Sequence, residues 1–177
     1  MKKYPPVVVV DENDNEIGSA MLAEVWQKGL YHRIVSVFVL DEDNRHMLLQ
    51  QRSSKVGIYP NCWDQAAGGH VDEGQTYDQA AHNEVKEEIG LTRFKLETVN
   101  TIRTNSVLAD GRIINRFDRI YAVRIPKGTA LEPEAAEVAK LQWFTAQELK
   151  DRFTKHPKQC TPDLLKLIAN HFPMFYQ

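Results

Sequence analysis

The sequence predicts an α+β protein, an α/β/α sandwich with a central mixed sheet between helices. Three observations carry this prediction. Apolar, β-branched runs follow one another in pairs joined by turn-forming residues, a pattern typical of hairpins. One helical run lies in the middle of the chain and another near its C-terminus. The length of 177 residues suits one domain with a substantial core, and no linker or repeat divides it, so a single domain over residues 1–177 is expected.

The first half of the chain is predicted to form two hairpins with a short helix between them. The polar stretch 11–15 is a suitable turn for the first hairpin, and Gly29 is a suitable helix terminator. A nearly all-apolar run is typical of a strand covered on both faces. The predicted elements are a hairpin over about residues 6–20, a helix over 21–29, and a deeper hairpin formed by 34–40 and 46–52.

The second half contains the central helix, a further pair of strands and the C-terminal helix. Thr76 with Gln79 has the spacing of a capping box, and Gly90 is a stop signal, so a helix over about 77–89 is expected. Asp110-Gly111 is a strong hairpin signal. The remaining predicted elements are strands over 94–108, 112–125 and 137–144, a short helix capped by Thr145 and Glu148, and a helix over about 162–171 with Thr161 as its N-cap.

Composition and charge limit the classes of partner that this chain is expected to bind. The formal net charge is −2 and 26% of the residues are charged, which gives no footprint for nucleic acid or an anionic membrane. No apolar run has the length of a membrane span, and the first six residues lack the apolar core of a signal peptide. We therefore expect a cytoplasmic protein with no nucleic-acid or membrane partner, and a homodimer is left open. Cys62 and Cys160 match no metal or redox spacing and are expected to be free thiols.

Three carboxylates crowd one side of the central helix. At 3.6 residues per turn Glu84 and Glu88 lie one above the other, and Glu87 falls on the same side. Like charges at this spacing repel, so either solvent screens them or a cation holds them together. Hard divalent cations such as Mg²⁺ take oxygen ligands from carboxylates and backbone carbonyls. Because the glycine pair Gly68-Gly69 lets the backbone approach a ligand closely, we predict a cation site here.

Residues 69–91 resemble the Nudix box, whose pattern is G-x5-E-x7-R-E-U-x-E-E-x-G-U with U apolar. The positions in register are Gly69, Glu84, Glu87, Glu88 and Gly90. Gln75 stands where the box has glutamate, and Asn83 stands where it has arginine. In the family, these two charged residues help to orient and charge-balance the metal-binding carboxylates. The resemblance therefore implies a Nudix fold and a metal-binding face with altered supporting residues.

The chain also resembles a branch of Nudix proteins related to isopentenyl-diphosphate isomerase, which contains hydrolases as well. The likeness lies in the N-terminal hairpin, in residues 29–33 and in residues 63–71. The isomerases carry a catalytic cysteine directly before the Gly-His pair, where this chain has Gly68. His32 and His70 fall where the isomerases place two metal-binding histidines, although each could instead have a structural role.

The resemblance implies a metal-dependent hydrolase of a nucleoside diphosphate linked to another moiety, with Mg²⁺ or Mn²⁺ as cofactor and a small-molecule diphosphate as substrate. The implied metal ligands are Gly69, Glu84, Glu87, Glu88 and His70. The implied catalytic glutamate, which removes a proton from the attacking water, is a box residue or one from a later loop. The candidates are Glu84, Glu87, Glu134 and Glu137. Two alternatives stay open: an isopentenyl-diphosphate isomerase-like enzyme, and a catalytically weak binding module with the same fold.

The expected substrate-binding residues are Arg52, Trp63 and Gly68. Arg52 ends a strand on the way to the glycine loop, and a guanidinium there could hold a phosphate through two hydrogen bonds. Trp63 could stack on a base, with packing in the core as the alternative. Architecture alone does not determine which diphosphate is the substrate.

Overall fold

The computed structural model describes residues 5–108 and 110–176, and its elements follow the predicted order. The strands are β1 (Val7–Val10), β2 (Glu16–Ala20), β3 (Tyr31–Asp41), β4 (His46–Arg52), β5 (Trp63–Gln65), β6 (Ala67–His70), β7 (Glu97–Val107), β8 (Ile113–Ile125) and β9 (Val138–Thr145). The helices are α1 (Leu22–Lys28), α2 (Tyr77–Ile89), α3 (Ala146–Lys155) and α4 (Pro162–His171), with short 3₁₀ turns η1 (Pro157–Gln159) and η2 (Pro173–Phe175).

The sheet is mixed, and β3 is its central strand. β3 runs parallel to β8 and antiparallel to β1, β4 and β6. It pairs with β4 only at Val39 and Leu40, because β6 takes the place of β4 along residues 34–37. β5, which directly precedes β6 in the chain, pairs with β4 instead. The sheet therefore divides between β5 and β6, and the glycine pair lies within β6, directly after this division.

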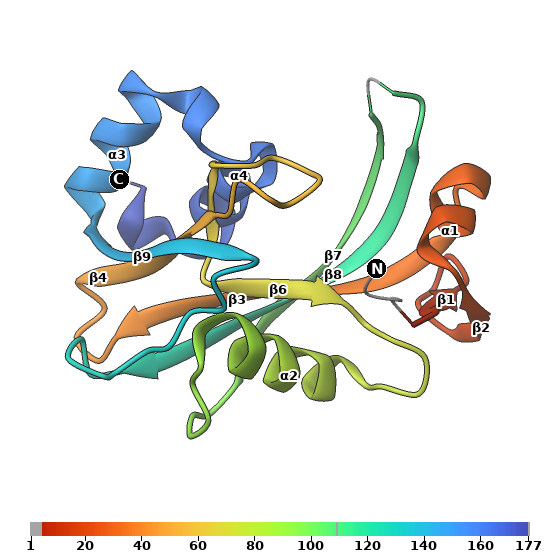
Figure 1. Ribbon diagram of the computed structural model, residues 1–177, viewed down its shortest axis with the longest axis horizontal. Coiled ribbons are helices and arrows are strands. Elements are labelled where there is room, and N and C mark those ends of the chain that lie inside the picture. Colours follow the sequence, from red (N-terminus) through yellow and green to blue (C-terminus); the bar gives the residue numbers. More distant parts are fainter. Residues whose placement is uncertain (1–4, 109, 177) are drawn as a thin grey trace.

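Alternation along β3 gives each face of the sheet its own core. Val35, Val37 and Val39 face α2, whose buried residues include Ala81, Val85 and Ile89. Phe38 and Leu40 face α3 and α4. Figure 1 shows the resulting layers, with α2 on one side of the sheet and α3 and α4 on the other. The predicted α/β/α sandwich with a central mixed sheet is confirmed. No helix in the described part of the chain is long and apolar enough to cross a membrane.

The capping signals were mostly reliable. Both predicted capping boxes form, at Thr76 with Gln79 and at Thr145 with Glu148. Gly29 and Gly90 end their helices in the left-handed conformation.

Two local predictions need correction. Thr161 occupies the N-cap position of α4 but makes no side-chain cap, because its hydroxyl donates instead to Asp64 Oδ1 at 2.8 Å. Strand β7 begins at Glu97 rather than at residue 94. The apolar side chains of Phe94 and Leu96 that suggested an earlier start pack against the core from the loop before the strand.

Candidate active site

Glu88 is a buried carboxylate held in one orientation by two donors. Its side chain is only 5% exposed. Glu88 Oε2 accepts hydrogen bonds from the backbone N–H of Gly68 at 2.9 Å and from Gln50 Nε2 at 3.0 Å. Burial and the nearby charges of Glu84, Glu137 and Asp64 raise the pKa of Glu88 well above its usual range, against the lowering effect of the Gly68 N–H. Acidic groups thus converge on Glu88 from three parts of the chain.

The two glycines of the loop have different physical reasons to be glycine. A Cβ on Gly69 would overlap the carboxylate of Glu84, so only glycine lets that carboxylate approach the loop backbone. A Cβ on Gly68 would lie 2.6 Å from the carbonyl oxygen of Val35 and 2.9 Å from Gln65 Nε2. The first contact is with rigid backbone in the middle of the sheet. Position 68 is therefore closed to any side chain, cysteine included, unless the strand moves.

The loop before β9 docks on the end of α2 and carries the late glutamates to the site. The N–H of Glu132 donates to the carbonyl of Ile89 at 3.0 Å, and the N–H of Glu134 donates to the carbonyl of Glu88 at 3.1 Å. Glu134 Oε1 accepts from the N–H of Ala136 within its own loop. The charge of Glu137, by contrast, acts on Glu88. Of these two expected loop bases, Glu137 is thus the one whose charge reaches Glu88.

We predict that Gly90→Ala destabilises the chain and weakens any activity that depends on this loop. Gly90 has a φ of +72°, and an added Cβ would lie 2.8 Å from the carbonyl oxygen of Glu132. The left-handed backbone alone costs alanine about 1–2 kcal/mol, and the clash adds to that cost. Chemical denaturation should show the loss. Gly74→Ala is a matched control, because Gly74 also has a positive φ but has open space around its Cβ position; an equal loss in both variants would contradict the docking role.

Glu87 is more exposed than Glu84 and Glu88. Its side chain is exposed, and its charge raises the pKa of Asp72 in the loop, after the larger effect of burial. Across residues 5–108 and 110–176, no three His, Cys, Asp or Glu side chains are arranged as a ready metal site. The expected ligand triplet thus consists of a buried residue, Glu88, a partly buried residue, Glu84, and an exposed residue, Glu87.

Glu84 and Glu88 nevertheless fit a hard divalent cation. The two carboxylates approach a glycine pair that carries no side chains, and the charge of Glu84 disfavours the ionised state of the buried Glu88. Oxygen donors of this kind are the ligands that Mg²⁺ and Mn²⁺ take in proteins. Gly69, Glu84 and Glu88 would hold such an ion, with Glu87 near enough in the chain to contribute.

His32 and His70 form a separate pair on the other face of β6. Their ring centroids are 5.4 Å apart with an interplanar angle of 24°, and Trp26 meets His70 edge-on at 6.3 Å. Burial lowers the pKa of His32 to about 4 and that of His70 to about 3, so both rings are neutral at pH 7. His70 lies opposite Ile34 in the sheet, whereas Gly69 lies opposite Val35 on the α2 face. The expected metal ligand His70 is thus directed away from Glu84 and Glu88.

Two expected substrate-binding residues are engaged elsewhere. Arg52 Nη1 lies 3.3 Å from the buried carboxylate of Asp64, and Arg52 Nε donates to the carbonyl of Ile58 at 3.1 Å. Trp63 is only 4% exposed, with its ring edge-on to Phe144 at 5.0 Å. A ring buried in this way offers no free face to a base, so the expected stacking role of Trp63 is corrected to one in core packing. The third residue, Gly68, lies at the site beside Glu88.

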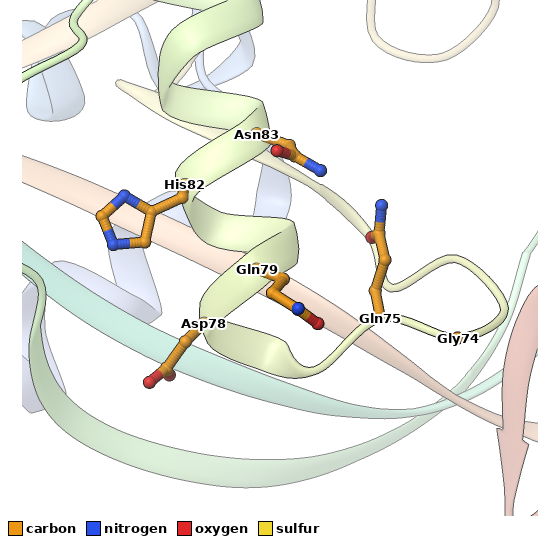
Figure 2. Close-up of a pocket in the computed structure, with 6 residues that line it drawn as sticks. All are labelled: Gly74, Gln75, Asp78, Gln79, His82 and Asn83. Carbon is orange, nitrogen blue, oxygen red and sulfur yellow. The ribbon is translucent and has the colours of Figure 1, made fainter.

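The two departures from the box, Gln75 and Asn83, lie on one pocket. This pocket has a volume of about 390 Å³ and lies between α2 and the loop before it. Figure 2 shows Gln75 and Asn83 pointing into the same space, with Gly74 in the loop nearby. Both side chains are uncharged amides, and Gln75 Oε1 also accepts from the N–H of Asp72 at 3.3 Å. The two positions that differ from the box are therefore neighbours on one pocket.

Sequence reasoning missed two supports of the site. Gln50 was not considered, because it is the first of three consecutive polar residues, 50–52, and the sequence gives no signal that it is buried. The N-terminal hairpin was expected as an element but not as a support. The N–H of Val8 donates to the carbonyl of Val71, and the N–H of Glu73 donates to that of Pro6, both at 2.9 Å. The first strand thus holds the backbone of the loop between β6 and α2.

The first turn of α2 is anchored to the turn of the N-terminal hairpin. The Tyr77 hydroxyl lies 3.0 Å from both carboxylate oxygens of Asp14, which also accepts from Arg33 Nε at 2.7 Å. The guanidinium groups of Arg33 and Arg119 lie over the Tyr77 ring, at 5.0 Å and 3.9 Å from its centroid. No sequence spacing indicates this contact, because it joins residues 63 positions apart.

A mixed sheet between helices, with a glycine loop facing a carboxylate-bearing helix, defines a class of proteins. The chain belongs to the Nudix family. A family model described as NUDIX domain matches residues 30–164.

Two curated relatives are similar to this chain over most of its length, and one is named an isomerase and the other a hydrolase. Isopentenyl-diphosphate Delta-isomerase 2 of Photorhabdus laumondii is 30% identical over 162 residues, covering 92% of this chain and 89% of that protein. A Nostoc protein named uncharacterized Nudix hydrolase all7351 is 30% identical over 171 residues, covering 95% of this chain and 94% of that protein. These relatives confirm the resemblance to the isomerase-like branch of the Nudix superfamily.

Solved structures agree on the fold. DR0079 from Deinococcus radiodurans has a TM-score of 0.76 at 19% identity, covering 94% of this chain and 99% of its own. The NUDIX domain of Shewanella oneidensis NrtR, solved with ADP ribose, has a TM-score of 0.62 at 20% identity, covering 87% of this chain and 98% of its own. At these identities the likeness shows the fold alone.

Proposed function

We propose that this chain is a metal-dependent Nudix hydrolase that cleaves the diphosphate of a small molecule, such as a nucleoside diphosphate linked to another moiety. One observation carries the proposal: the buried Glu88 carboxylate is fixed by Gly68 N–H and Gln50, and the neighbouring Glu84 carboxylate lies against Gly69, where any side chain would displace it. A buried carboxylate whose pKa is raised further by a neighbouring carboxylate is costly for folding alone. A site that binds a cation and a diphosphate gives them a use.

Each residue then has a defined task. When bound, Mg²⁺ or Mn²⁺ neutralises the diphosphate and lowers the pKa of the attacking water. Gly69, Glu84 and Glu88 would hold the cation, and Glu87 would add a ligand from the exposed side. Gly68 N–H and Gln50 keep Glu88 from turning away. Glu137, whose charge already acts on Glu88, is the proposed acceptor of the water proton.

An isopentenyl-diphosphate isomerase-like activity is the second candidate, because several relatives of about 30% identity carry that name. The residue at position 68 argues against an isomerase activity. Gly68 has no proton to give, and its Cβ position lies 2.6 Å from the Val35 carbonyl oxygen. The third candidate is a binding module without turnover, which the neutral residues Gln75 and Asn83 favour.

One experiment separates the three candidates. Hydrolysis of nucleotide sugars, ADP-ribose, dinucleotides and nucleoside di- and triphosphates is measured with Mg²⁺ and with Mn²⁺, and isomerisation of isopentenyl diphosphate is measured in parallel. We expect hydrolysis of at least one diphosphate and no isomerisation.

We predict that Glu84→Gln lowers this hydrolysis by at least about 100-fold, since replacing a supporting partner of a metal ligand already costs about 10–100-fold. The matched control is Glu42→Gln, an exposed carboxylate in the turn after β3, which should leave the rate unchanged. Equal inertness of wild type and Glu84→Gln across the panel would leave the binding module as the function.

A further inference from the structure

A buried carboxylate lies on the opposite face of the sheet from Glu84 and Glu88. Asp118, on β8, is only 2% exposed. Asp118 Oδ2 accepts a hydrogen bond from the Ser36 hydroxyl at 2.9 Å, but Oδ1 has no hydrogen-bond partner among the described residues. A buried carboxylate oxygen without a partner costs more than almost any other unpaired group, so it requires an explanation.

The strand register places Asp118 beside the glycine loop. Ile34 of β3 lies between Asp118 of β8 and His70 of β6, and Ser36 lies opposite Gly68. Ser36 of β3 therefore connects Asp118 of β8 to Gly68 of β6. Glu88 reaches Gly68 from α2 at its N–H, so one residue, Ser36, separates Asp118 from the glycine that binds Glu88.

The surroundings of Asp118 are polar and partly open. Arg116 lies two residues earlier on the same face, pairs with Asp163 at the start of α4 at 2.6 Å, and keeps 24% of its side chain exposed. Gly68 and His70 are also partly exposed. Burial raises the pKa of Asp118 to about 6, against the lowering effects of Arg116 and Ser36, so the group is largely ionised at pH 7. At that pH Oδ1 is an acceptor.

Building on the proposed hydrolase function, we propose that Asp118 determines specificity by accepting a hydrogen bond at Oδ1 from the non-phosphate half of the substrate. A diphosphate held by Glu84 and Glu88 at β6 would extend its organic half past Gly68 toward Asp118. The substrate class is a diphosphate whose organic half carries an N–H or O–H donor. A nucleobase amino group and a ribose hydroxyl both supply this chemistry.

Matched substrate pairs test the assignment. ADP is compared with purine riboside 5′-diphosphate, which lacks the amino group, and with 2′-deoxy-ADP, which lacks a ribose hydroxyl. Sites built to bond a donor reject analogues that lack it, so wild type should prefer ADP by about tenfold or more in one pair. In Asp118→Asn the Ser36 hydroxyl can bond the amide oxygen, which leaves an NH₂ donor in place of the acceptor. That variant should lose the preference.

The control is Asp163→Asn, which alters a carboxylate of the same cluster that is exposed and already paired; it should keep the preference. If Asp118→Asn does not fold, Ser36→Ala, which leaves the carboxylate but removes its fixed partner, should weaken the same preference. An equal loss for all three nucleotides in Asp118→Asn, or no preference in wild type, would overturn the assignment.

The preference is also measured as binding, by calorimetry with Ca²⁺. Should no diphosphate be hydrolysed, the proposed function fails, whereas the binding preference still decides the role of Asp118.

Discussion

Replacing Glu88 by glutamine is expected to reduce diphosphate hydrolysis by at least about 100-fold while leaving the folded chain as stable as the wild type or more stable. Glutamine keeps an oxygen that can accept from Gly68 N–H and Gln50 Nε2, so the local hydrogen bonds survive. It removes the buried charge that a cation needs. Loss of activity together with retained stability is the signature of a residue selected for its chemistry.

The pH dependence gives this prediction a second readout. Burial raises the pKa of Glu88 above its unfolded value, so the folded chain holds the proton longer than the unfolded chain. The stability associated with Glu88 is therefore fully present below the unfolded pKa and is lost as the pH rises through the folded pKa. Glu88→Gln lacks this titration. In EDTA, its melting temperature should fall less than that of the wild type as the pH rises from acid to neutral.

Thermal denaturation and hydrolysis assays on the same preparations check both parts of this prediction, with Glu42→Gln as the exposed-carboxylate control. A Glu88→Gln variant that hydrolyses at the wild-type rate, or that unfolds at a much lower temperature in EDTA, would contradict the assignment of Glu88 as a cation ligand.

Gly68→Cys is expected to destabilise the fold by about 1–3 kcal/mol and to create no isomerase. The added Cβ would lie 2.6 Å from the Val35 carbonyl oxygen, and that oxygen belongs to a strand paired on both sides. β3 cannot move away without disturbing the N–H of Gly68, which donates to Glu88. The variant should therefore also lose hydrolysis.

Chemical denaturation, diphosphate hydrolysis and isomerisation of isopentenyl diphosphate are the measurements. Gly57→Cys is the matched control, because the Cβ position of Gly57 has open space around it. Isomerase activity gained by Gly68→Cys would revive the isomerase candidate, since it would show that only the missing proton donor separates this chain from those enzymes.

The sequence could predict the features that depend on residues close to one another in the chain. The bounds of α2 follow from Thr76, Gln79 and Gly90, which act within one turn of their own position. The layers follow from alternation and from the resemblance to the Nudix box. The division of the sheet between β5 and β6 could not be predicted, because it depends on which distant strand each short segment pairs with.

The carboxylates on the helix could be predicted from the sequence, but the residues that contact the site from other elements could not. Glu84 and Glu88 were identified from spacing, yet Gln50 reaches Glu88 from 38 residues away. For Trp63 the sequence left base stacking and core packing open, because it does not show that Phe144 packs against the ring. For Thr161, the carboxylate of Asp64 competes successfully for the hydroxyl that the local pattern assigned to the helix. In each case a residue distant in the sequence determines the contacts of the side chain.

The contacts of the N-terminal hairpin limit where this protein can be truncated. The family match begins at residue 30, yet Pro6 and Val8 hold the loop backbone at Val71 and Glu73, and Asp14 holds Tyr77 at the start of α2. A truncation at the boundary of the family match would remove the residues that hold the loop between β6 and α2, while leaving every box residue in place. Part of what shapes this site thus comes from a segment that the family match does not include.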